Sequence, residues 1–222
     1  MKPAIGSLNA GVVIAKKYFV CKIPHMRILL RSFLFMILIT VSQWVFAQPD
    51  QPDAAARQKT KEDFMTPGPM HKVLSILEGT WEGDVTFWPA PGVGPFKSKS
   101  RAVNKSVYDG LFQEQEHIGI IGGKPYYSKL IWGYDKARKK FFIFGIDNMG
   151  SDHLRTEGTF DSTTRTWTFV GAKTDALTGK DNILRETRQL TDNNTQIMNM
   201  YVPDKASGKE FHILQIVYTR QP

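Results

Sequence analysis

From Gly79 to the end of the chain, apolar and polar side chains alternate with a period of two. Residues 81–87 read WEGDVTF, so the odd positions are apolar or glycine and the even positions are polar. This alternation predicts a strand with one buried face. Turn residues such as Gly, Pro, Asn and Asp separate successive segments of this kind. The predicted strands are Thr80–Trp88, Lys97–Tyr108, Leu111–Ile121, Tyr126–Tyr134, Lys140–Asp147, Asp152–Phe160, Thr166–Gly171, Asn182–Leu190, Gln196–Val202 and Glu210–Thr219.

Between these strands, no segment has the length and the 3.6-residue period of a crossover helix. Parallel pairing needs such crossovers, so the strands are expected to pair with their sequence neighbours in antiparallel fashion. We therefore predict an all-β fold, an up-and-down barrel of about ten strands, because closure leaves no exposed strand edge. Apolar residues in His71–Leu77 predict a short helix that precedes the barrel and packs on one of its ends. The run FFIFGI at 141–146 is apolar on both faces, which predicts a cover on its outer side.

The chain before the barrel divides into two parts. Residues 1–47 are expected to be a secretory signal peptide, with Arg27 and Arg31 before the apolar run 32–41 and cleavage after Ala47. An uncleaved anchor is the alternative, since residues 28–47 nearly span a bilayer, and translation from Met26 is a further hypothesis. Residues 48–63, rich in Pro, Asp, Ala and Gln, predict a disordered linker, and residues 64–222 form the predicted barrel domain.

The net charge of +8 suggests an anionic partner, but the leader carries much of the excess. Residues 1–47 contain six Lys and Arg and no acid, which leaves 23 basic against 21 acidic residues, a net +2. We therefore expect no nucleic-acid partner and no stable membrane insertion after cleavage. The single cysteine, Cys21, precedes the cleavage site, so no disulfide is expected in the mature domain. The predicted location is periplasmic or secreted.

A resemblance to known proteins rests on short motifs spread over Phe64–Arg220. Gly79-Thr80-Trp81 resembles the G-x-W that opens the first strand of lipocalin-like proteins, where the tryptophan closes one barrel end beneath a short helix. Further motifs are Met65–Pro69, Gly133–Asp135, Ile146–Gly150, Gly158–Asp161, Thr178–Lys180, Arg185-Glu186 and Val217–Arg220. Together they are similar to a bacterial family of domains of unknown function grouped with the calycins. The resemblance implies a calycin barrel of about ten strands and no particular activity, and the extra charge at Arg138–Lys140 departs from the family pattern.

Candidate binding residues are polar side chains that share a strand face with large apolar ones. Glu186 and Arg188 share the face of the neighbouring leucines, whereas Arg185 falls on the opposite face. A charge inside a barrel must be paired, so Glu186 with an arginine predicts an internal ion pair. As in lipid-binding barrels, Arg188 or Arg185 with Tyr201 would suit a ligand carboxylate, and a salt bridge between strands is the alternative. The candidate ligand-binding residues are Trp81, His117, Arg155, Arg185, Glu186, Arg188 and Tyr201.

Catalytic and metal-binding patterns are weak in this sequence. The acid pairs Glu114/Glu116 and Glu82/Asp84 each share a strand face, which permits an acid–base site but is more typical of a solvated outer wall. His71, His117, His153 and His212 do not stand at metal-ligand spacing, although a barrel could bring His117 and His153 together. We expect no catalytic residue, no metal and no cofactor. The leading hypothesis is an exported protein that binds a small hydrophobic or amphipathic ligand; the alternatives are a filled envelope interaction module and an acid–base enzyme.

Overall fold

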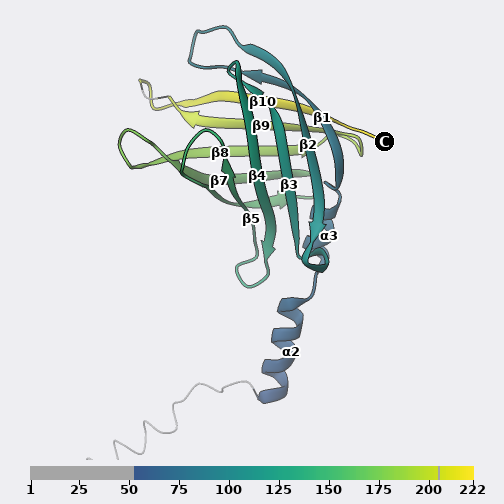
Figure 1. The fold of residues 1–222 in the computed structure, drawn as a ribbon. Helices are drawn as coiled ribbons and strands as arrows, with labels where there is room; N and C mark the ends of the chain where they lie inside the picture. The colour runs from purple at the N-terminus through teal and green to yellow at the C-terminus, as the bar shows by residue number, and fades with distance from the viewer. Residues whose placement is uncertain (1–52, 205) are drawn as a thin grey trace, which may run out of the picture. The chain divides into compact units, whose positions relative to one another are not determined.

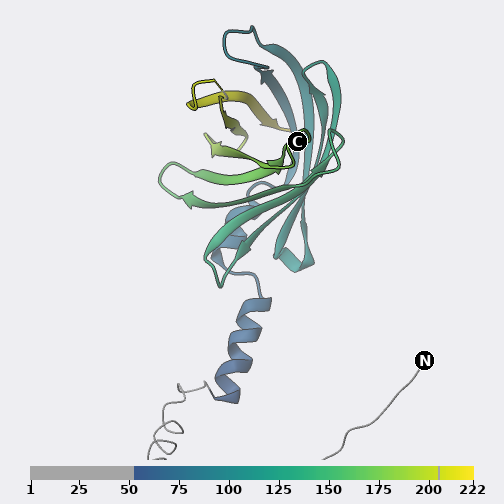
Figure 2. The same cartoon turned by 90° about the vertical axis from the view of Figure 1, so that its left-hand side faces the viewer.

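Ten antiparallel strands close into one barrel, in which each strand pairs with its sequence neighbours and β1 pairs with β10 (Figures 1 and 2). The computed structural model describes residues 53–204 and 206–222, so the predicted signal peptide lies outside the described residues. The strands are β1 (Gly79–Phe87), β2 (Phe96–Val107), β3 (Phe112–Ile121), β4 (Lys124–Asp135), β5 (Lys140–Asp147), β6 (Leu154–Asp161), β7 (Thr166–Thr174), β8 (Asp181–Leu190), β9 (Thr195–Pro203) and β10 (Glu210–Arg220). The predicted fold class is confirmed.

Helix α3 (Pro69–Ser75) packs on the end of the barrel where β1 begins, next to a single 3₁₀ turn, η1 (Tyr108–Gly110). We call this the helix end, and the opposite end, where β1 finishes, the far end. The Trp81 indole donates a 2.9 Å hydrogen bond to the carbonyl of Leu77 just after α3. The Arg220 guanidinium lies 4.1 Å from the Trp81 ring centre and donates to the carbonyl of Ile76 at 2.6 Å. Trp81 therefore joins the helix to the barrel, as the lipocalin-like motif implies.

Helix α2 (Ala54–Met65) occupies most of the segment for which we expected a disordered linker. That expectation is wrong for residues 54–63. Ala, Gln, Lys and Arg favour helix whether or not they contact a core, and α2 has no buried residue. At its end, the Lys136 ammonium group donates to the carbonyls of Asp63 and Thr66, where a cation complements the helix dipole. A lack of large apolar side chains excludes a core here, but not a helix.

The outer wall at β5 is open rather than covered. Phe144 is 47% exposed and Ile146 is 55% exposed, so the predicted cover is wrong within the described residues. A shallow depression of about 570 Å³ follows this wall past Phe142, Phe144 and Val170. Its rim includes Arg138, bound to Glu157 with one contact of 2.9 Å. Apolar residues on both faces of a strand therefore do not by themselves show that another element covers its outer face.

Two glycines permit close approach inside this tightly curved sheet. A Cβ atom at Gly83 would lie 2.8 Å from Ile216 Cγ2 and 3.0 Å from a ring carbon of Tyr218. At Gly171 it would overlap the backbone of Arg155 on β6. A side chain at either position would push neighbouring strands or lumen side chains apart. Gly83 thus leaves room for the Tyr218 ring inside the barrel.

Candidate functional site

A charged pair lies inside the barrel on strand β8. Residues Leu184, Glu186, Arg188 and Leu190 are buried, and the positions between them are partly exposed, so the predicted strand faces are confirmed. The Arg188 guanidinium lies 3.3 Å from the Glu186 carboxylate, and the two side chains are 1% and 3% exposed. Arg188 also donates to the Gln196 side-chain oxygen at 3.3 Å. Burial of Glu186 raises the pKa of its carboxyl group, while the neighbouring guanidinium opposes that rise.

Arg188 reaches across the barrel from β8 to β4. Its guanidinium carbon lies 4.5 Å from the centre of the Trp132 ring and 5.7 Å from that of Tyr218. Trp132 in turn meets Phe169 edge to face, with ring centres 5.5 Å apart. Cation–π contacts help to hold a guanidinium away from water. Together with Glu186 and Gln196, these side chains form a layer that extends across the barrel interior from β8 to β4, and we call it the polar layer.

His117 extends the polar layer to β3. Its Nε2 atom lies 3.5 Å from the Tyr218 hydroxyl, and its ring meets that of Tyr126 edge to face at 5.5 Å. Burial, and then the charge of Arg188, lower the pKa of His117 to about 4. Burial raises the pKa of Tyr218 to about 12 and also raises that of Tyr126. At neutral pH these three side chains are uncharged, and the ion pair of Arg188 with Glu186, at 3.3 Å, is the charged contact of the layer.

Several buried polar atoms in this layer lack a hydrogen-bond partner. They are Trp132 Nε1, Arg188 Nε, Gln196 Nε2 and, beside Tyr218, Ser100 Oγ. The first three are N–H groups that only donate, and the serine hydroxyl donates or accepts. Each buried group left unpaired costs about 1–3 kcal/mol, so such groups call for an explanation. The layer offers a surplus of donors, which acceptor oxygens would satisfy.

Between the polar layer and the far end, the inner wall is only partly buried. Ladder partners share a face, and the pairs Gly119–Tyr126 and His117–Ser128 place Tyr126 and Ser128 on the inner wall with His117. Side chains of this region have intermediate exposure, although they face inward. They are Phe87, Tyr126, Ser128, Leu130 and Met200. Solvent therefore reaches parts of this inner wall, which carries several apolar side chains.

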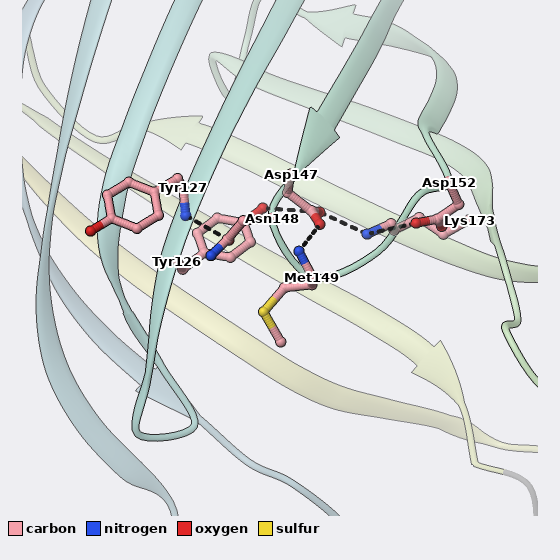
Figure 3. A network of polar contacts seen from close by, with 7 residues as sticks. All are labelled: Tyr126, Tyr127, Asp147, Asn148, Met149, Asp152 and Lys173. Carbon is pink, nitrogen blue, oxygen red and sulfur yellow. Dashed lines mark hydrogen bonds and ion pairs between the residues drawn. The ribbon is translucent and has the colours of Figure 1, made fainter.

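A polar network stands where the far end opens (Figure 3). Lys173 of β7 lies 2.7 Å from the Asp147 carboxylate at the end of β5 and 3.7 Å from Asp152. Asp147 also receives hydrogen bonds from the Met149 amide at 2.9 Å and from the Tyr126 hydroxyl at 3.5 Å. Asp147 therefore stabilises the turn after β5 by accepting the Met149 amide, and its ion pair with Lys173 joins β7 to the β5–β6 connection. A further depression of about 560 Å³ lies beside this network, between Met149–His153 and residues of β7 and β8.

Residues 66–220 match the model of a family described as a protein of unknown function, DUF1579. The chain belongs to the DUF1579 family. This membership and the closed barrel confirm the predicted resemblance in family and fold. No curated protein matches the chain.

Two solved structures resemble the DUF1579 barrel. Rv2717c from M. tuberculosis superposes with a TM-score of 0.56 at 18% identity, over 71% of this chain and 100% of that one. The S-type phycobiliprotein lyase CPES from Guillardia theta gives a TM-score of 0.50 at 9% identity, over 72% of this chain and 97% of that one. At these identities the likeness concerns the fold alone.

Three of the predicted binding residues lie on the outer wall of the DUF1579 barrel. Arg155 pairs with Asp181 at 3.2 Å. Arg185 binds Glu210 at 2.6 and 2.7 Å and lies 4.1 Å from the ring centre of its ladder partner Tyr201. Arg185 and Tyr201 both stand one residue out of phase with the inward positions, so neither arginine holds a ligand carboxylate together with Tyr201 inside the barrel. Tyr201 stacks on His212 instead, with ring centres 4.8 Å apart.

The remaining predicted residues face inward. His117, Glu186 and Arg188 belong to the polar layer, whereas Trp81 lies at the helix end. The sequence did not predict the inward positions of four further residues, Tyr126, Trp132, Lys173 and Tyr218. The two-residue periodicity of β7 could have placed Lys173 on the same face as Trp167 and Phe169. Nothing in the sequence shows that Lys173 contacts Asp147.

The paired acids do not form an acid–base site. Lys129 lies 3.3 Å from Glu114 and 3.4 Å from Glu116 on the outer wall. Glu82 and Asp84 also face outward, beside Arg101 and Lys99. His153 packs on Phe144, with ring centres 5.4 Å apart, rather than in the layer of His117. Among residues 53–204 and 206–222, no three His, Cys, Asp or Glu side chains gather in a way that could hold a metal ion.

Proposed function

We propose that the DUF1579 domain binds one small amphipathic molecule inside its barrel. The polar group of the ligand would lie on the polar layer, and its apolar part along the inner wall towards the far end. One observation carries this proposal: unpaired, buried donors of Trp132, Arg188 and Gln196 lie in a layer beneath a partly exposed inner wall. Ligand sites of this kind combine an apolar lining with a few placed polar groups.

The fold supports the proposal in a general way. Closed barrels of eight or more strands can enclose a small ligand between their inward side chains. One structural neighbour carries the name of a phycobiliprotein lyase, and its barrel is similar to this one in fold. Within the described residues, no helix is long and apolar enough to cross a membrane.

Binding of N-phenyl-1-naphthylamine, an uncharged dye that fluoresces in apolar surroundings, tests the proposal. We expect saturable binding of one dye molecule to the purified protein. The variant Ser128→Trp places a large ring on the partly exposed inner wall, and we expect it to weaken dye binding at least tenfold. The matched control Tyr127→Trp changes the adjacent residue, which is 56% exposed on the outer wall, and should bind the dye like the unmodified protein.

Two outcomes would contradict interior binding. Absence of saturable dye binding would favour a filled barrel that acts as an interaction module. Equal binding by Ser128→Trp and the unmodified protein would place the dye on the outer wall, where the β5 region is exposed. Thermal unfolding of both variants shows whether each has folded, so that loss of the fold is not mistaken for loss of the site.

Export of the chain is a separate proposal that rests on the leader sequence. Arg27, Arg31 and the apolar run 32–41 support a signal peptide cleaved after Ala47. Amino-terminal sequencing of the protein recovered from its own cells would then begin at Gln48. A product that begins at Met1 or Met26 would contradict cleavage.

A further inference from the structure

We infer that the polar group of the ligand is an uncharged acceptor, such as an ester, ketone or amide carbonyl, and not a carboxylate. This inference rests on the proposed function, since it names the chemical class that the same interior site accepts. It reverses the expectation that an inward arginine serves a ligand carboxylate, and the reason lies in the residues around Arg188.

Arg188 already has its counter-ion. Among the described residues its guanidinium is the one cation of the polar layer, and Glu186 lies 3.3 Å from it. Both side chains are almost fully buried, so neither charge is screened by water. A ligand carboxylate would place a second anion against a single guanidinium in an environment of low dielectric constant. An anion without a partner in such a place is strongly unfavourable.

No other group of the layer can supply the missing positive charge. His117 lies 3.5 Å from the Tyr218 hydroxyl and is uncharged at neutral pH. Lys173 stands nearer the far end and is already shared by two carboxylates, Asp147 and Asp152. Those three residues together carry one more negative than positive charge, which further disfavours the entry of an anion.

The unpaired atoms of the layer point to the same chemistry. Trp132 Nε1, Gln196 Nε2 and Arg188 Nε are donors without an acceptor. A carbonyl oxygen has two lone pairs and would accept hydrogen bonds from such donors without adding a charge. The layer therefore lacks hydrogen-bond acceptors, but it already has a negative charge. An uncharged carbonyl group adds an acceptor and brings no further negative charge.

Displacement of N-phenyl-1-naphthylamine at pH 7.5 by methyl dodecanoate and by dodecanoate tests the inference. The two competitors have the same chain and differ in the charge of the head group. We expect the ester to displace the dye at concentrations at least tenfold lower than the acid. Equal or tighter binding of dodecanoate would overturn the inference and leave the proposed function standing. If the dye binds and neither competitor displaces it, the inference fails and the proposed function stands on the dye; if the dye itself does not bind, the proposed function fails as well.

A substitution at Glu186 sharpens the test. In Glu186→Gln the guanidinium loses its counter-ion and keeps a hydrogen-bonding neighbour of similar size. We expect dodecanoate to bind at least tenfold tighter than it binds the unmodified protein, with the affinity for methyl dodecanoate changed less than threefold. The control Glu114→Gln removes a carboxylate from the outer wall and should change neither affinity. The ester and acid comparison on the unmodified protein decides the question even if Glu186→Gln does not fold.

Discussion

The hydroxyl of Tyr218 on β10 lies 3.5 Å from Nε2 of His117 on β3, although 101 residues separate them in the chain. Strands β1 and β2 stand between β3 and β10 in the barrel order, so the contact is made inside the barrel and not along a strand ladder. It links the histidine to the layer of Arg188 and Trp132. Burial of His117, and then the charge of Arg188, disfavour the charged imidazole, which makes the folded state sensitive to acid.

We predict that His117 destabilises the fold as the pH falls from 6.5 to 4. Its pKa is lowered to about 4 in the folded state from an ordinary value of 6.5, so the unfolded chain binds more protons in this interval. Stability from this group is complete above pH 6.5 and is lost towards pH 4, by about 3 kcal/mol in all. Urea unfolding of His117→Gln should show a flatter dependence on pH than the unmodified protein. Parallel curves for the two proteins would contradict the assignment.

We predict that Arg188→Met destabilises the protein by about 3–5 kcal/mol, because it leaves the Glu186 carboxylate buried without a partner. The double variant Glu186→Leu/Arg188→Met removes both charges from the interior. It should recover most of that loss, since apolar residues often replace a buried ion pair at little cost. Urea unfolding of the single and double variants measures the difference. A double variant no more stable than Arg188→Met would show that the pair itself contributes stability.

Gly171 and Gly94 should respond to the same substitution in opposite ways. Gly171→Ala introduces a Cβ atom that overlaps the backbone of Arg155, so we expect separation of β6 and β7 at a cost of about 3 kcal/mol or more. At Gly94 a Cβ atom would meet nothing within 4 Å, and Gly94→Ala should change stability by less than about 0.5 kcal/mol. Denaturant unfolding compares the two. Similar values would mean that β6 and β7 do not approach as closely as the structure indicates.

Lys173→Met should loosen the connection between β5 and β6. The substitution leaves Asp147 and Asp152 facing each other without their shared cation, and their side chains are only 11% and 18% exposed. We expect a loss of about 1–2 kcal/mol in stability and faster hydrogen exchange at the Met149 amide, which donates to Asp147. Lys180→Met, in the exposed β7–β8 loop, is the control. Unchanged exchange at Met149 in Lys173→Met would show that the ion pair does not hold this loop.

The sequence by itself determined the barrel and much of its inner face. Period two fixes which residues of a strand lie together, and this was enough to place Glu186 and Arg188 on one face and Arg185 on the other. The turn residues and the lack of crossover segments then required antiparallel neighbours. The outer position of Arg155, by contrast, needed the register of β6 against β7, because a shift of one residue inverts a strand.

Only the tertiary structure decided which side chains meet across the lumen. Trp132 and Tyr218 reach Arg188 from other strands, and Lys173 reaches Asp147 from β7. Such contacts between distant strands depend on the curvature of the barrel and on the glycines that permit it, so no local sequence pattern predicts them. Local propensity did specify α2, which needs no partner for its helical form. The alternation of apolar and polar residues along each strand therefore predicted the fold. The candidate site arises from closure of the barrel, which brings distant strands to face one another.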